Sequence, residues 1–94
     1  MFVILLKYLK PISEVDKFLV PHRAYLDELY QQNVLVASGP QIPRNGGVLI
    51  ASGMEKSQLE SLLKKDPFAI NGIAEYTIIE FEAVKNQPAI KDFA

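Results

Sequence analysis

The sequence predicts an α+β domain of the ferredoxin-like β-α-β-β-α-β kind, with a four-stranded antiparallel sheet. Short runs of branched and aromatic residues alternate in that order with segments of helical periodicity. In this split pattern both helices pack on one face of the sheet. Several strands are apolar at consecutive rather than alternate positions, so both faces of the sheet are expected to carry apolar side chains.

The first strand and the first helical region occupy the beginning of the chain. Residues 2–9 are a branched and aromatic run that stops at a lysine-proline pair, which predicts a strand. Ser13 is a candidate N-cap for a first helical piece of about two turns. Pro21 favours the first position of a second helical piece that runs through Gln32. Asn33 is the expected terminator of this helix.

The rest of the fold follows from the second half of the chain. Residues 34–38 and 48–51 predict the second and third strands, and residues 73–81 predict the last one. Ser52 is expected to begin the second helix, with Glu55 three residues later completing a capping box. A leucine stripe at helical spacing supports that helix.

The 94 residues are expected to form a single domain over 1–94, with a core over about 1–82 and a polar C-terminal tail or interface arm over 83–94. A domain this small buries a limited share of its surface, and the absence of cysteine excludes disulfides and thiolate metal sites. Because two helices cover only one apolar sheet face, we expect a homodimer whose uncovered faces pack together and enclose a cavity.

Charge and hydropathy argue against two classes of partner. The 10 Lys+Arg and 11 Asp+Glu residues give a formal net charge of −1, without the basic excess that nucleic-acid binding needs. The longest apolar stretch, residues 2–6, is far shorter than the roughly 20 residues that span a bilayer, and it lacks the flanks of a signal peptide. We therefore expect a cytoplasmic protein with no membrane and no nucleic-acid partner.

His22 is the only histidine and the main candidate for chemistry. It precedes Leu26 by four residues, which directs it toward the core side of the predicted helix. Histidine suits general base catalysis near neutral pH, and the alternative is a packing role under Leu26. Asp66 before Pro67 is typical of a helix N-cap, and its second oxygen can also orient a histidine. Two such ligands per subunit are too few for a metal site, and we expect none.

Five further residues are candidates for binding a small molecule, each with a structural alternative. Arg44 lies in a loop between strands, where it either offers a positive charge to an anionic substrate or is simply solvated. Ser38 and Gly39 either form a turn or allow the backbone to approach a ligand closely. Tyr8 and Phe68 either line a cavity or pack in the core. Because no loop has the glycine pattern of a nucleotide site, we expect no cofactor.

Three blocks of the sequence are similar to those of a known family. They are His22-Arg23-Ala24-Tyr25-Leu26, Ala37-Ser38-Gly39-Pro40 and Asp66-Pro67-Phe68. In order and spacing they resemble the YciI-like (YCII-related) family of small bacterial proteins, from the first strand to about Phe81. The resemblance implies a dimeric α/β barrel of the ferredoxin-like kind. It also implies a cleft with a histidine and an aspartate, which fall on His22 and Asp66.

The residues and the resemblance together predict a cofactor-independent lyase or isomerase, or a dehydrochlorinase-like enzyme. In this interpretation His22 takes a proton from a small aromatic or enolic substrate, and Asp66 orients the imidazole and stabilises its charged form. The alternative is a non-catalytic module that binds a small molecule or serves assembly, because one fold supports many functions.

Overall fold

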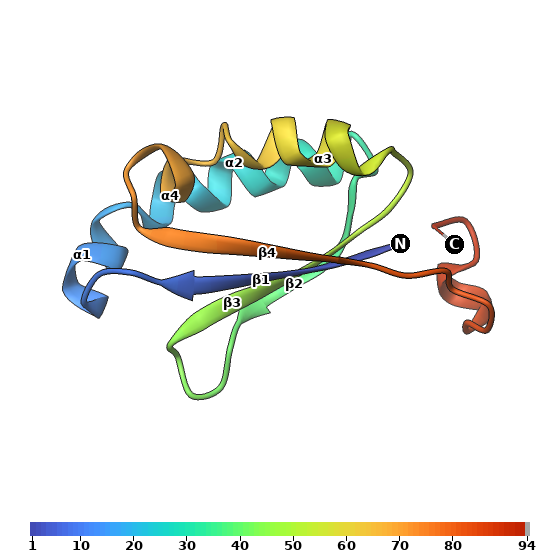
Figure 1. The fold of residues 1–94 in the computed structure, drawn as a ribbon, viewed down its shortest axis with the longest axis horizontal. Helices are drawn as coiled ribbons and strands as arrows, with labels where there is room; N and C mark the ends of the chain where they lie inside the picture. Colours follow the sequence, from blue (N-terminus) through green and yellow to red (C-terminus); the bar gives the residue numbers. More distant parts are fainter. Residues whose placement is uncertain (94) are drawn as a thin grey trace.

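The computed structural model describes residues 1–93 and confirms the predicted α+β class. The elements in chain order are β1 (Phe2–Tyr8), α1 (Ile12–Lys17), α2 (Leu19–Gln31), β2 (Leu35–Pro40), β3 (Gly46–Ala51), α3 (Lys56–Leu63), α4 (Pro67–Ile70), β4 (Ala74–Glu80) and the 3-10 turn η1 (Pro88–Ile90). The strands form one antiparallel sheet in the spatial order β2-β3-β1-β4. Helices α2, α3 and α4 lie on the same side of this sheet (Figure 1).

The core lies between these helices and one face of the sheet. On the central strand β1, Phe2, Ile4 and Leu6 point toward the helices and are at most 3% exposed. Leu49 and Ala51 of β3 pair beside them and are buried as well. Side chains from the helical layer complete the core, among them Val15, Leu26, Leu29, Leu59, Leu63 and Phe68.

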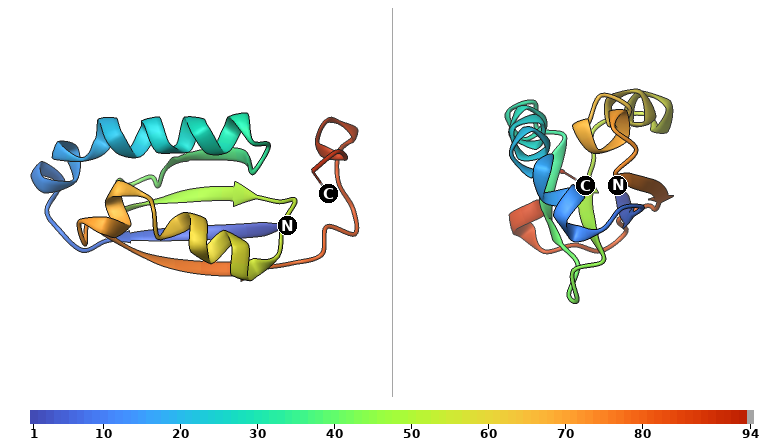
Figure 2. Two further views of the ribbon diagram at one scale, coloured as in Figure 1. Left: turned by 90° about the horizontal axis from the view of Figure 1, so that it is seen from above. Right: turned by 90° about the vertical axis from the view of Figure 1, so that its left-hand side faces the viewer.

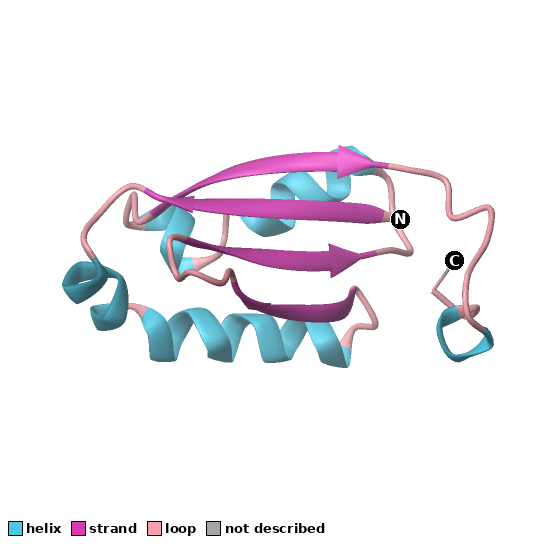
Figure 3. Cartoon of the chain, turned by 90° about the horizontal axis from the view of Figure 1, so that it is seen from below, coloured by secondary structure: helices cyan, strands magenta, loops and turns pink. Residues whose placement is uncertain are grey.

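The opposite face of the sheet is also apolar, as the consecutive apolar positions predict. Val3 pairs with Ile50 of β3 and with Ile79 of β4. Two residues further along β1, Leu5 pairs with Val48 and is 41% exposed. No helix formed by residues 1–93 covers this side of the sheet (Figure 3). We call the surface formed by Val3, Leu5, Val48, Ile50 and Ile79 the open face.

Two predictions about the first helices are wrong. Helix α1 begins at Ile12 after Pro11, and Ser13 is not its N-cap. Helix α2 begins at Leu19 and holds Pro21 as its third residue rather than its first. The N–H groups in the first turn of a helix have no partner within the helix, so a proline there removes no hydrogen bond. The second helix therefore starts earlier than the proline alone suggests.

The end of α2 follows the prediction. Asn33 has a left-handed backbone conformation with φ of 59°, which asparagine tolerates better than most residues. The N–H of Val34 bonds the carbonyl of Leu29 at 2.9 Å, and the N–H of Asn33 bonds that of Tyr30 at 3.0 Å. This pair of bonds is a Schellman motif, and it turns the chain from α2 into β2.

The start of α3 also differs from the prediction. Glu55, not Ser52, is the N-cap, and the N–H of Glu55 donates to Gln58 Oε1 at 2.9 Å. Ser52 is buried, and its N–H bonds the carbonyl of Val34 at 3.0 Å. Ser52 therefore belongs to the end of the β2-β3 pair, because its backbone is already engaged there.

A close approach of β3 to β1 places the loop that carries Arg44. A Cβ atom on Gly46 would overlap the backbone oxygen of Leu6, so only glycine fits at this position. The N–H of Tyr8 bonds the carbonyl of Asn45 at 3.3 Å, which ties the loop to the end of β1. Arg44 is thereby held beside Tyr8.

The C-terminal segment leaves the two layers after β4 (Figure 2). The N–H of Phe81 donates to the carbonyl of Met1 at 2.9 Å, and the amino group of Met1 donates to the carbonyl of Phe81 at 3.0 Å. The chain then forms loops and η1 up to Phe93. The role of 83–94 as a tail or interface arm stays a prediction, and Ala94 lies outside the described residues. Within residues 1–93, no helix has the length and apolar character needed to cross a bilayer.

Candidate active site

His22 and Asp66, which are 44 residues apart in the sequence, meet inside the protein. His22 lies in the first turn of α2 and is 7% exposed, and Asp66 precedes α4 and is fully buried. The Nδ1 atom of His22 lies 2.7 Å from Oδ1 and 2.9 Å from Oδ2 of Asp66. The structure thus brings together the two residues that the sequence singles out.

Asp66 is held in place by its own helix, as the sequence predicts. Pro67 occupies the first helical position of α4, and the N–H of Phe68 donates to Oδ1 of Asp66 at 3.0 Å. The hydroxyl of Tyr76 on β4 donates to Oδ2 at 2.6 Å. The carboxylate therefore joins α2, α4 and the edge strand of the sheet.

These contacts determine which nitrogen of His22 carries the proton in the neutral ring. Phe68 and Tyr76 both donate to Asp66, which is the arrangement that an ionised, acceptor-only carboxylate requires. Nδ1 of His22 then donates as well, and Nε2 keeps its lone pair. His22 lines the cavity described below while Asp66 lies behind it. Nε2 is consequently the ring nitrogen that is available to a ligand.

Aromatic packing fixes the plane of the imidazole ring. The ring of Phe68 stacks on that of His22, with centroids 3.8 Å apart and planes inclined by 2°. Tyr8 meets Phe68 edge-on, at a centroid distance of 6.2 Å and an angle of 89°. His22 is therefore restrained both through Nδ1 and across its face, as a positioned base requires.

Two tyrosines near the carboxylate are kept protonated. Burial and, after it, the charge of Asp66 raise the pKa of Tyr76 well above its usual range. The same two causes raise the pKa of Tyr25, whose hydroxyl donates to the carbonyl of Leu62 at 2.6 Å. Tyr76 is not among the residues that the sequence singles out for the site. Only the alternation of β4, which directs Tyr76 to the helix side, signals its position.

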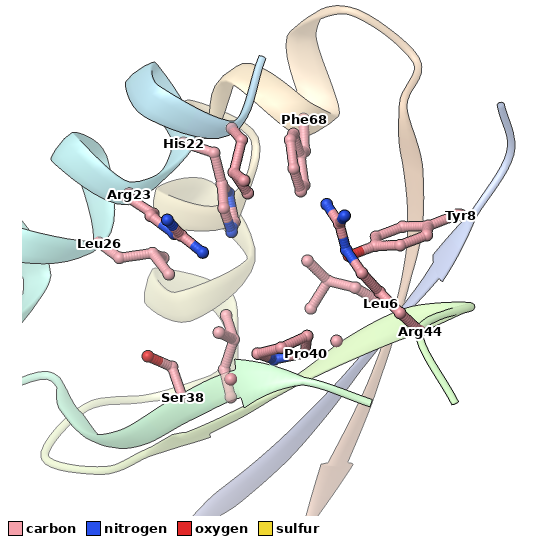
Figure 4. A pocket seen from close by; sticks show the side chains of 13 residues that line it. Leu6, Tyr8, His22, Arg23, Leu26, Ser38, Pro40, Arg44 and Phe68 are labelled. Atoms are coloured by element: carbon pink, nitrogen blue, oxygen red, sulfur yellow. The ribbon is translucent and has the colours of Figure 1, made fainter. Parts of the chain in front are cut away.

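A cavity of about 250 Å³ opens in front of His22 (Figure 4). We expected a cavity between the sheets of two subunits, but this one lies within a single chain, between the helical layer and the sheet. All five predicted binding residues line it. The lining consists of Leu6, Tyr8, Leu19, His22, Arg23, Leu26, Ser38, Gly39, Pro40, Arg44, Gly47, Leu49 and Phe68.

The polar residues of the lining differ in how they are held. Ser38 shares a hydrogen bond of 2.7 Å with the hydroxyl of Tyr30. Arg44 forms an ion pair of 2.6 Å with Asp16 of α1. Hydrogen bonds, first with Asp16 and then with Tyr8, raise the pKa of Arg44, which therefore remains charged. Arg23 also lines the cavity, although it is not among the predicted binding residues.

The protein provides little for a metal ion to bind. Within residues 1–93 no group of three or more histidine, cysteine, aspartate or glutamate side chains is arranged to hold one. Asp66 directs its oxygens to His22, Phe68 and Tyr76.

The fold and the site define a small ferredoxin-like domain with a buried histidine–aspartate pair beside a cavity. Residues 1–82 match the family described as the YCII-related domain, and the chain belongs to this family. The resemblance drawn from the three sequence blocks is thereby confirmed.

A solved structure has the same fold. It is 5-chloro-2-hydroxyhydroquinone dehydrochlorinase (TftG) from Burkholderia phenoliruptrix AC1100, in complex with 2,5-dihydroxybenzoquinone. The two structures align with a TM-score of 0.66, over 87% of this chain and 94% of that chain, at 19% sequence identity. No curated protein sequence matches this chain.

Replacement of Tyr76 by phenylalanine is expected to reduce the loss of stability at alkaline pH. The pKa of Tyr76 in the folded protein lies above the value near 10 of an unfolded tyrosine. Its contribution to the free energy of unfolding is therefore complete below about pH 10 and is lost as the pH rises further, by up to about 1.4 kcal/mol per pH unit. Urea unfolding of wild type and Tyr76→Phe from about pH 7 to about pH 11 measures the difference.

Tyr30→Phe is the matched control, because it removes a tyrosine hydroxyl that does not touch Asp66. This variant is expected to keep the alkaline loss of the wild type. Equal alkaline slopes for wild type and Tyr76→Phe would contradict the assignment.

Proposed function

We propose that the protein is a cofactor-independent enzyme that transfers a proton on a small aromatic or enolic substrate, as a lyase or an isomerase. The observation that carries the proposal is the buried His22–Asp66 pair, whose geometry leaves Nε2 of His22 available to a cavity. A packing histidine would need neither a fully buried carboxylate behind it nor open space in front of it.

The size of the cavity favours a molecule with one ring. A cavity of roughly 150 Å³ holds benzene in a protein interior, so about 250 Å³ leaves room for a ring with several substituents. Tyr8 offers aromatic surface, and the largely buried side chains of Leu6, Leu26, Leu49 and Phe68 form apolar walls. These surfaces suit a flat, partly apolar ligand.

The proposed mechanism begins with His22 as a general base. Nε2 accepts a proton from a hydroxyl or from an activated carbon, and the electron pair of the broken bond stays on the substrate as a phenolate or an enolate. The imidazolium that forms is stabilised by the negative charge of Asp66. Return of the proton to another carbon completes an isomerisation, whereas departure of a leaving group with its electron pair completes an elimination.

The comparisons support this class of reaction. The structural neighbour is named a dehydrochlorinase and is bound to a dihydroxybenzoquinone, a planar molecule of one ring. We infer a related substrate class for this chain because the family, the fold and the size of the cavity point in the same direction.

His22→Ala is expected to lower turnover by about 10²–10⁴-fold, the usual contribution of a positioned general base. The reaction to follow is exchange of the ring hydrogens of 2,5-dihydroxybenzoquinone with D₂O, monitored by NMR, because exchange requires a deuteron to be added to a ring carbon and a proton to be removed from it. Release of chloride from 5-chloro-2-hydroxyhydroquinone is the parallel assay for elimination.

Gln31→Ala, at the exposed end of the same helix, is the matched control and is expected to keep wild-type rates. Circular dichroism verifies that His22→Ala is folded. Full activity in His22→Ala would exclude the mechanism. If the wild type binds these compounds but accelerates neither reaction, the protein is a binding module instead.

We also propose that the protein is a homodimer in which two open faces pack against each other. Val3 and Ile79 lie side by side on this surface, and Leu5 beside Val48 extends it. Soluble monomers rarely expose a contiguous apolar patch of this kind. A two-fold axis lets the same surface serve both subunits, and it leaves each cavity on the outer, helical side.

Leu5→Lys is expected to shift the protein to monomers, because it places a charge within the apolar contact. Its effect on the dimer Kd is expected to be at least about tenfold. Light scattering at micromolar concentration measures the mass. Val20→Lys is the control, since Val20 is 79% exposed on the helical layer. A monomeric wild type, or an unchanged mass for Leu5→Lys, would contradict the dimer.

A further inference from the structure

The charges around the cavity are all of one sign. Arg23 and Arg44 line it, and no aspartate or glutamate is among the lining residues. The chain as a whole has 11 acidic and 10 basic residues, so its net charge does not explain this local excess. Asp16, the carboxylate nearest to Arg44, lies outside the lining, and Asp66 is fully buried behind His22.

The two arginines approach the cavity from different elements. Arg23 follows His22 on α2, and Arg44 comes from the loop between β2 and β3. Figure 4 shows both side chains directed into the space in front of His22, with the guanidinium of Arg44 reaching past Tyr8. A ligand in contact with His22 therefore lies between two positive charges.

The arginines also differ in their present partners. Arg44 uses Nη2 to bind Asp16 at 2.6 Å, which fixes its position and leaves further N–H groups for a ligand. Arg23 forms no ion pair or side-chain hydrogen bond with any group in residues 1–93. A guanidinium presents donors in a planar fork that matches a carboxylate or a pair of enolate oxygens.

We propose that the site selects an anionic single-ring substrate, and that Arg23 is its principal anion-binding residue. The ligand class is a ring of benzene size with a carboxylate or an ionised enol oxygen. In the bound ligand the reacting hydrogen faces Nε2 of His22, and the anionic group faces Arg23. Only this orientation of the ring rests on the proposed function. The binding preference itself needs no catalysis.

The same arrangement fits the proposed reaction. Removal of a proton from an anionic ring adds a second negative charge to the substrate. Guanidinium groups in a partly enclosed site stabilise that charge, and Arg44 does so without having to reorganise, because Asp16 already holds it. Both arginines also disfavour cationic ligands, so the site discriminates by charge as well as by size.

Binding of benzoate and of its neutral isostere benzamide tests the preference. Isothermal titration calorimetry at neutral pH gives the Kd of each compound for the protein in its own oligomeric state. Benzoate is expected to bind at least about tenfold more tightly than benzamide, since charge-assisted hydrogen bonds are about twice as strong as neutral ones. Arg23→Gln is expected to remove this advantage and to leave the Kd of benzamide unchanged.

Arg44→Gln is expected to weaken benzoate binding less, because its ion pair with Asp16 already neutralises part of its charge. Lys17→Gln is the matched control, because it removes a positive charge whose partner is Glu14 and which does not line the cavity. Its Kd for benzoate is expected to equal that of the wild type.

Equal affinity for benzoate and benzamide would overturn the inference, as would full benzoate affinity in Arg23→Gln or no binding of benzoate at all. These outcomes are separable from failure of the proposed function. Arg23-dependent benzoate binding without proton exchange refutes the catalysis and keeps the anion site, whereas exchange on 2,5-dihydroxybenzoquinone without an anion preference refutes only the anion site.

Discussion

The buried carboxylate of Asp66 is the interaction on which the rest of the site depends. Burial of a charged group is costly unless it is paired and hydrogen-bonded, and Asp66 receives bonds from His22, Phe68 and Tyr76. Loss of one partner from such a buried pair usually costs about 3–5 kcal/mol. The hydrogen bonds that compensate for the burial of the Asp66 carboxylate also join α2, α4 and β4, and they leave Nε2 of His22 to face the cavity. The carboxylate of Asp66 therefore both joins these elements and orients the imidazole of His22.

The two faces of the sheet differ in what they carry. The helix side carries the core and, at one end of it, a cavity of about 250 Å³. The open face carries no group of the histidine–aspartate pair. In the proposed dimer, subunit contact there would provide the additional burial that a small domain needs, without closing the cavity.

The sequence predicted the sheet, the apolar character of both its faces and the pair His22–Asp66, because each depends on a local pattern or on the resemblance. Asn33 and Asp66 were predicted as helix boundaries, because left-handed turns and N-caps have strong residue preferences. Ser13 and Ser52 were wrong as N-caps, since several residues nearby satisfy the same preference and tertiary contacts choose among them. The contact of Tyr76 and the direction of Arg23 depend on how distant elements pack, which a short pattern does not encode.

The tautomer of His22 tests this chemistry most directly. The chain has a single histidine, so every imidazole signal in a long-range ¹H–¹⁵N correlation spectrum of the labelled protein belongs to His22. With the ring neutral, the hydrogen bond to Asp66 places the proton on Nδ1, and Nε2 is expected to show the ¹⁵N shift of an unprotonated nitrogen. A protonated Nε2 in the neutral ring would contradict the assignment of His22 as the base, because no lone pair would then face the cavity.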